Sequence, residues 1–147
     1  MSLVTDKVFY NALRSNAELM QAVGGRIEST SIPVPDKDFL NEPVPYVIIT
    51  FDGLQNEGFT KDNDFEGILD RVQVSIEVAA ESRDELGSIM QTIRQTIIEY
   101  FEDTESHAWD DYDYIPTNYT LTASPVGYDG DKPCYYQTLT YNCDTKP

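Results

Sequence analysis

The sequence is poor in the residues that build most reactive or covalently stapled sites. Its 147 residues include two cysteines and one histidine, His107. Cys134 and Cys143 are nine positions apart, so one continuous strand would place them on opposite faces, where they could not form a disulfide with each other. Together with His107 they match no zinc-site spacing. We therefore expect neither a zinc centre nor a disulfide framework.

Basic residues are few and scattered. The chain has 10 Lys plus Arg against 26 Asp plus Glu, a formal net charge of −16, and no Lys or Arg occurs between Arg94 and Lys132. Nucleic acid is bound mainly by clusters of Lys and Arg that displace counterions from phosphates, so a nucleic-acid binding role is disfavoured. The excess negative charge supports solubility. A sharper interpretation is a surface beside which DNA slides without adhering.

Long hydrophobic runs are also missing. No apolar stretch approaches the about 20 residues that a membrane span requires. Met1 to Tyr10 has neither a basic start nor an apolar segment of the secretory type. We expect a protein that is made in the cytoplasm, does not enter a membrane and has the length of one domain over residues 1–147.

The first third of the chain indicates two short helices. Thr5 can cap the first, and Ser15 with Glu18 has the capping-box pattern that would start the second. Gly24 and Gly25 then supply the left-handed exit. The apolar positions recur at helical spacing: Val8, Phe9, Ala12, Leu13, Leu19, Met20 and Val23.

Two strands are expected next, with loops around them. Four prolines between Ile32 and Pro45 predict a loop or a sheet edge, and Tyr46 to Phe51 has the β-branched and aromatic composition of a strand that is buried or seated in a subunit contact. Asp70 to Ala80 alternates apolar and polar residues, as a half-buried strand does. The polar stretch Gly53 to Gly67 is expected to protrude as a loop.

The last half predicts one long helix and a hairpin. Ser82 and Glu85 form a second capping box, and an apolar stripe then runs from Arg83 to Phe101. Thr117 to Val126 and Cys134 to Cys143, separated by the turn Gly127 to Pro133, indicate two paired strands. The fold class expected is α+β: a mainly antiparallel β-sheet with helices packed on one face, in two layers.

Candidate reactive sites are weak. Asp62, Asp64 and Glu66 resemble the start of a calcium loop, but Gln73 stands where the closing glutamate should be. The acidic run Glu102 to Asp113, which includes His107, is typical of a solvated face more than of a metal or catalytic site. The tyrosines of the second half lack the basic neighbours of an RNA-stacking surface, so burial at a protein interface fits them better. We expect no enzymatic activity, no metal and no cofactor.

The order of these parts resembles the tail-terminator or tail-completion proteins of long-tailed phages, which act in head-tail joining and also occur in prophages. The resemblance covers most of the chain and is carried by four segments: Leu13 to Ile27, Pro45 to Phe51, Val72 to Val78 and the helix Arg83 to Phe101. It implies a non-enzymatic structural protein whose sheet carries helices on one face.

The resemblance also implies partners and a place of action. Six copies would close into a ring, in isolation or only on the tail tube. The ring would cap the tail-tube protein and meet the head-tail connector protein, while DNA passes nearby without specific binding. The chain would act in the host cytoplasm during assembly and then at the tail-head junction of the virion. We expect subunit or tube contacts in two segments, through Tyr46, Ile48, Phe51, Phe59, Asp62, Asp64 and Phe65.

A second hypothesis comes from the charge alone. An acidic inhibitor or immunity-type protein that mimics DNA would present its carboxylates as one contiguous face, and the segment Glu99 to Asp113 would then control association. Such a protein is expected to be a monomer whose binding weakens with salt. A ring formed by the purified chain would favour the tail-terminator hypothesis, whereas a monomer under all conditions would leave that hypothesis only as assembly on the tube and raise the inhibitor hypothesis toward parity.

Overall fold

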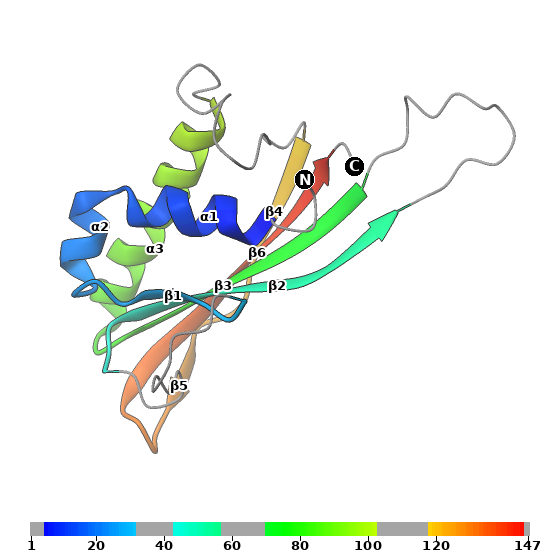
Figure 1. Cartoon of the computed structure of the whole chain (residues 1–147). Coiled ribbons are helices and arrows are strands. Elements are labelled where there is room, and N and C mark those ends of the chain that lie inside the picture. Colours follow the sequence, from blue (N-terminus) through cyan, green and yellow to red (C-terminus); the bar gives the residue numbers. More distant parts are fainter. Residues whose placement is uncertain (1–4, 32–42, 57–69, 103–117, 146–147) are drawn as a thin grey trace, which may run out of the picture.

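The computed structural model describes residues 5–31, 43–56, 70–102 and 118–145 (Figure 1). Within these ranges the chain forms three helices and a six-stranded sheet. The elements in chain order are α1 (Thr5–Arg14), α2 (Ala17–Ala22), β1 (Ile27–Ser29), β2 (Tyr46–Asn56), β3 (Asp70–Ala80), α3 (Arg83–Glu102), β4 (Asn118–Ala123), β5 (Gly127–Asp129) and β6 (Cys134–Thr145).

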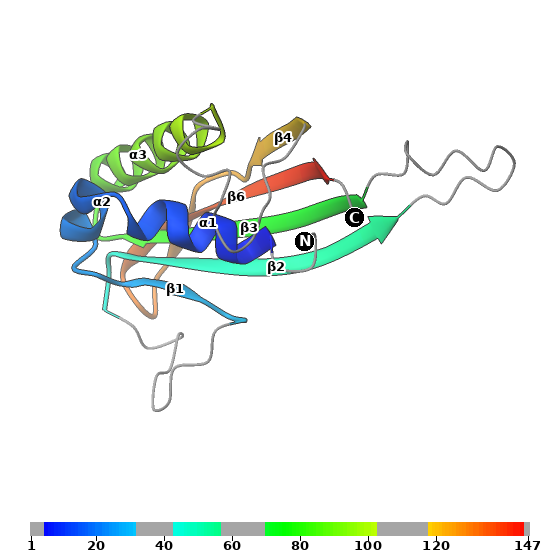
Figure 2. The same cartoon turned by 45° about the horizontal axis from the view of Figure 1, so that its top comes forward.

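The sheet has the strand order β1-β2-β3-β6-β4, and β5 follows β4 along the same edge of β6. β1 and β2 run parallel, and every other pair is antiparallel. The three helices lie together on one face of the sheet (Figure 2). The expectation of an α+β fold with a mainly antiparallel sheet and helices on one face is therefore confirmed.

Alternation along the long strands separates the two faces. In β3 the side chains of Val72, Val74, Ile76 and Val78 are almost completely buried beneath the helices, whereas Arg71 and Gln73 are exposed on the other face. β6 repeats this pattern in register, with Leu139 beside Ile76, Tyr141 beside Val74 and Cys143 beside Val72. The strand Asp70 to Ala80 has the bounds that the sequence indicated.

The core joins the helices to the middle of the sheet. The Phe9 ring of α1 lies with its centroid 5.4 Å from Phe101 of α3 and 5.1 Å from Tyr141 of β6. Tyr119 of β4 closes this cluster, at 5.4 Å from Phe101 and 5.8 Å from Tyr141. Edge and tilted ring contacts of this kind add about 0.5–1.5 kcal/mol each to the gain from burial.

Strand β2 is longer than the sequence indicated. Gly53 was expected to end it, but the strand continues to Asn56 through a bulge in which Phe51 faces Val74, Gly53 faces Gln73 and Asp52 has no partner in the ladder. Gly53 has a φ of 147°, a conformation that favours glycine, so the residue allows the bulge and not a chain reversal. Residues 57–69 of the expected loop lie outside the described residues.

Two other local predictions need correction. Helix α2 is capped by Asn16, whose side chain accepts a hydrogen bond from the Leu19 amide at 3.1 Å, and not by Ser15, which donates to the Ala12 carbonyl at 2.7 Å. The segment Gly127 to Pro133 is not all turn, since Gly127 to Asp129 forms β5 against β6.

Two other helix boundaries, the end of α2 and the start of α3, have the capping residues that the sequence predicted. Gly24 and Gly25, with φ of 59° and 75°, end α2 in a Schellman arrangement in which the Gly25 amide donates to the Met20 carbonyl at 2.8 Å. Ser82 accepts a hydrogen bond from the Glu85 amide at 3.1 Å at the start of α3.

Both cysteines are free and buried, on opposite faces of β6. None of the described helices is long and apolar enough to cross a membrane.

Candidate interaction surface

The face of the sheet opposite the helices is polar. The middle of this face carries hydroxyl side chains from four neighbouring strands, and charged groups lie toward its two ends. The hydroxyl residues, assigned to this face by register, are Thr50, Ser75, Thr138, Thr140, Thr120 and Thr122. This patch of hydroxyl side chains is uncharged, although the chain as a whole has a net charge of −16.

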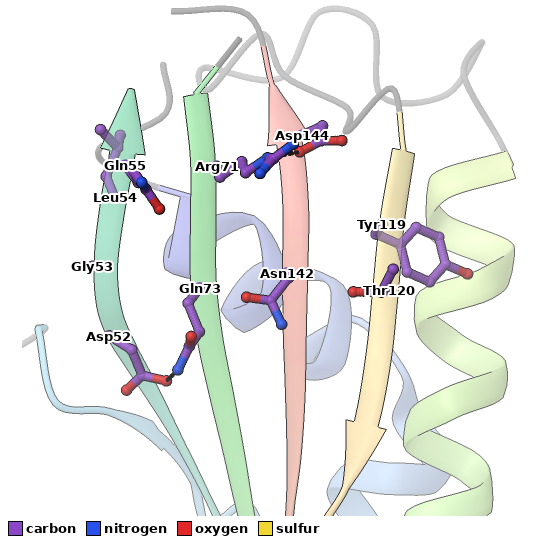
Figure 3. Close-up of a pocket in the computed structure, with 10 residues that line it drawn as sticks. All are labelled: Asp52, Gly53, Leu54, Gln55, Arg71, Gln73, Tyr119, Thr120, Asn142 and Asp144. Carbon is purple, nitrogen blue, oxygen red and sulfur yellow. Dashed lines mark hydrogen bonds and ion pairs between the residues drawn. The ribbon is translucent and has the colours of Figure 1, made fainter. Parts of the chain in front are cut away.

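A hollow of about 500 Å³ lies at one end of this face (Figure 3). Asp52 accepts hydrogen bonds from Gln73 at 3.1 Å and from the Ser75 hydroxyl, and Arg71 Nε lies 3.5 Å from Asp144 Oδ1. The polar hollow, as we call it, is lined by Asp52, Gly53, Leu54, Gln55, Arg71, Gln73, Tyr119, Thr120, Asn142 and Asp144. Four of its polar side chains are paired with one another, Asp52 with Gln73 and Arg71 with Asp144.

A second hollow, of about 350 Å³, lies toward the other end of β2 and β6 and has a different character. Tyr136, 39% exposed, shares this face of the sheet with the buried side chains of Ile48 and Cys134. The Tyr128 side chain, 58% exposed, lies beside Tyr135 on the opposite face of the same strand pair. The tyrosine hollow, as we call it, is lined by Tyr46, Ile48, Glu77, Tyr128, Asp129, Gly130, Lys132, Cys134 and Tyr136. Aromatic side chains around a small apolar floor are typical of protein interfaces.

Its electrostatics come from two carboxylates and one ammonium group. Lys132 Nζ lies 5.0 Å from the centroid of the Tyr46 ring. Burial, followed by the nearby charge of Glu77, raises the pKa of Tyr46 from 10.0 to about 12. Burial and then Asp129 raise the pKa of the Cys134 thiol, whereas Lys132 lowers it. The tyrosine hollow therefore disfavours new negative charge.

The position of Tyr136 depends on a glycine on the neighbouring strand. Gly127 faces Tyr136 in the β5–β6 ladder, and a Cβ at Gly127 would come within 2.3 Å of Tyr136 Cζ. The Tyr136 ring thus lies directly over the Gly127 backbone. In the next pair of this ladder, the rings of Tyr128 on β5 and Tyr135 on β6 lie 5.1 Å apart on the opposite face of the sheet. The contact with Gly127 therefore fixes Tyr136 as the exposed aromatic side of the tyrosine hollow.

Both outer edges of the sheet contain a segment that no strand pairs with in the described parts of the chain. β1 covers β2 only at Val47 to Ile49, leaving Thr50 to Asn56. On the far side, β4 pairs with β6 along one edge only. The Ser124 amide donates to Thr138 at 2.9 Å, so alternation directs the Ala123 amide away from β6.

The residues that the sequence indicated for subunit or tube contact are divided by the structure. Tyr46 and Ile48 line the tyrosine hollow. Phe51 faces the helices instead and packs partly buried against the core. The remaining four lie outside the described residues: Phe59, Asp62, Asp64 and Phe65.

The sequence did not indicate the other members of the tyrosine hollow. Glu77, Asp129 and Tyr136 come from three separate strands, and only the pairing register brings them to Tyr46. The available signal was weak: an aromatic pair, Tyr135 and Tyr136, and a further tyrosine inside the expected turn.

Metal ligation has no support in the parts of the chain that the structure describes, where no three His, Cys, Asp or Glu side chains group around a common point. The calcium-like residues Asp62, Asp64 and Glu66, the histidine His107 and most of the acidic run lie outside those parts. The described geometry therefore directs attention to surfaces and not to reactive groups.

Comparison with known proteins identified a similarity of fold. The chain resembles a chain of the virion of a native gene transfer agent (GTA) particle. The TM-score is 0.54 at 11% sequence identity, and the similarity covers 97% of this chain and 94% of the other. Comparison with known protein families found no match, and neither did comparison with curated protein sequences.

The similarity extends over nearly the full length of both chains. A two-layer unit of a sheet and helices recurs in many unrelated proteins, so a partial match would say little. Here the match covers 97% of this chain and 94% of the other, with little sequence in common. The two chains therefore have the same overall fold.

Proposed function

We propose that this chain is a structural protein of a phage-like particle, a tail terminator that caps the tail tube and joins it to the head. One observation carries the proposal: the fold similarity to a chain of a gene transfer agent virion, which covers 97% of this chain. The order of segments that resembles tail-terminator proteins supports it independently, because the sequence identity to that virion chain is only 11%.

The role requires surfaces and no reactive group. A terminator acts sterically, since one face of a closed ring ends growth of the tube and the other receives the head. The net charge of −16 suits a ring through which DNA moves, because like charges repel the phosphates. In this proposal the chain acts at the tail-head junction, with the tail-tube protein and the head-tail connector as its neighbours.

The open sheet edges suggest how copies would join. One copy would offer the outward amide of Ala123 on β4, and the next would offer the Thr50 to Asn56 edge of β2. These two edges differ from each other, so the contact between copies is head-to-tail. Repetition of a head-to-tail contact closes a ring when the rotation from one copy to the next divides a full turn evenly. The Asp52 bulge would limit the length of the pairing.

Light scattering of the purified chain over a range of concentrations and salt tests the proposal, with negative-stain imaging of any large species. We expect a ring-shaped hexamer of 16.7 kDa chains, about 100 kDa in total. Ala123→Pro removes the outward amide of β4 and is expected to weaken ring formation at least ~5-fold. Thr122→Ala, an exposed change on the same strand, is the matched control and is expected to keep the ring.

The competing outcome is equally specific. A monomer at every concentration, whose only association is with a basic protein and is abolished by salt, would support the DNA-mimic hypothesis instead. A ring that forms equally well in Ala123→Pro would keep the terminator role and reject the edge contact. A hexamer that binds the tube but not the connector would separate tube capping from head joining.

A further inference from the structure

The exposed aromatic surface of the described residues is concentrated on the β5–β6 pair. Tyr128 and Tyr136 are the two large hydrophobic side chains exposed in those parts of the chain, and they lie on opposite faces of the β5–β6 pair, with Tyr136 on the face of the tyrosine hollow. Tyrosine is enriched where proteins bind one another, because a rigid ring offers contact area at a small cost in side-chain entropy. The hollow is therefore a candidate recognition site.

Its size limits what can enter. A volume of about 350 Å³ is at the low end for ligand sites and suits one long side chain better than a folded element. The floor, formed in part by Ile48 at 8% and Cys134 at 3% exposure, is apolar and suits the methylene part of such a side chain. The head group must then suit the rim.

Charge selects the head group. Glu77 from β3 and Asp129 from β5 both line the hollow, against Lys132 as its one basic group. Burial is the largest cause of the raised pKa of Tyr46, and the two carboxylates add to it. The negative potential of these carboxylates favours a cation. Tyrosine faces attract cations through their quadrupole. An anionic or neutral head group would gain neither the attraction to the carboxylates nor the cation–π contact.

The chain itself provides an example of this recognition. Lys132 Nζ already lies over the Tyr46 ring at 5.0 Å, so the hollow holds an ammonium group in a cation–π contact. Tyr136 offers a further aromatic side chain nearer solvent, on the same face as Asp129. A second cation can approach this ring, on the side of the hollow that Asp129 also lines.

We propose that the tyrosine hollow is a binding site for a lysine or arginine side chain presented by a loop of a partner protein. The occupant is assigned by charge complementarity between this hollow and a cation, and by the Lys132 contact. The inference stands on the hollow alone and does not depend on the virion role. It predicts that the partner's contact loop is basic, in contrast to this chain.

The test is a nuclear magnetic resonance titration of the ¹⁵N-labelled chain. The probes are two capped tripeptides, Gly-Arg-Gly and its neutral citrulline analogue. We expect the arginine peptide to shift amide signals saturably in β5, at the start of β6 and at Tyr46 and Ile48. The citrulline peptide, which has nearly the same shape and no charge, is expected to bind at least 5-fold more weakly.

Variants locate the site. Glu77→Gln is expected to weaken the arginine peptide about 3- to 10-fold, and Tyr136→Ala roughly 2- to 5-fold. Glu18→Gln is the matched control, because it removes one carboxylate from the exposed side of α2 in the helical layer. It is expected to leave the affinity unchanged. The amide spectrum of each variant reports whether it remains folded.

Three results would overturn the inference. Equal binding of the citrulline peptide would show that charge is not recognised. Shifts spread over the acidic surface and unchanged by Glu77→Gln would show non-specific attraction to a chain of net charge −16. Shifts of the hollow's signals with protein concentration alone would show that a second copy, and not a basic partner, occupies the hollow.

Discussion

The side chain of Asn16 connects two helices. Its oxygen accepts from the Leu19 amide at 3.1 Å and caps α2, while its nitrogen donates to Thr96 Oγ1 of α3 at 2.7 Å. We expect Asn16→Ala to lower the free energy of unfolding by about 1–2 kcal/mol, because both bonds are lost. Ser15→Ala should cost less than about 0.5 kcal/mol. Urea unfolding followed by circular dichroism measures both, and a larger cost at Ser15 would make Ser15 the cap.

The buried thiol of Cys143 makes stability depend on alkaline pH. Burial, with Asp144 as a smaller cause, raises its pKa from 9.0 to about 12, so the folded state retains a proton that the unfolded chain loses first. The stabilising contribution is complete below about pH 9 and is lost as pH rises toward 12. We expect the unfolding free energy to fall across that window.

Cys143→Ala isolates this effect. The variant loses packing at every pH, but its stability should fall less steeply between pH 9 and 11, by up to about 1.4 kcal/mol per pH unit. Chemical unfolding at several pH values gives both slopes. Identical slopes, or rapid reaction of Cys143 with a thiol reagent at pH 8 in the folded protein, would contradict the buried, protonated thiol.

At the scale of elements, the end of α2 and the N-terminal part of α3 each contain a glycine, and replacement by alanine is expected to have opposite effects on stability at the two positions. Gly25 has a φ of 75°, so Gly25→Ala is expected to destabilise by about 1–2 kcal/mol even though the nearest atom, Met20 Cε, is 3.9 Å away. Gly87 is exposed on α3 with open space around it, so Gly87→Ala should stabilise by about 0.5–1 kcal/mol. Thermal unfolding of both variants in one buffer tests the signs, and a stabilising Gly25→Ala would refute the argument.

Local patterns predicted most of the elements. The alternation of Asp70 to Ala80 and the apolar stripe of α3 each reflect one strong periodicity, and both elements have nearly the expected bounds. The errors occur where one residue permits two outcomes. Gly53 can end a strand or bend it, and the choice is made by the partner strand β3, which is distant in sequence. Asn16 and Ser15 are both good caps, and Thr96 favours Asn16.

The candidate site was less predictable than the fold. Tyr46 and Ile48 could be singled out because a strand with apolar residues on both faces needs cover on both. Glu77 and Tyr136 could not, because their proximity to Tyr46 follows from strand register across β3 and β6. Register is set by the entire core, and no short segment specifies it.

At the scale of the whole molecule, the net charge of −16 should govern the response to salt. Repulsion among carboxylates destabilises the compact state, and added ions screen it. We expect the midpoint of thermal unfolding to rise by about 2–4 °C between 10 and 200 mM NaCl, which corresponds to roughly 1 kcal/mol. Scanning calorimetry measures the shift, with sucrose of equal osmolality as the uncharged control. A falling midpoint would indicate that attractive ion pairs dominate.

The order of strands in the sheet has a consequence for how the chain folds as it is made. β4 and β5 attach to the rest of the sheet through β6, although both precede β6 in the sequence. Until β6 emerges from the ribosome, β3 has one unpaired edge and its apolar face is only partly covered by α3. A nascent chain interrupted before Cys134 would therefore lack β6, leaving β4 and β5 without their partner strand and the edge of β3 exposed to aggregation.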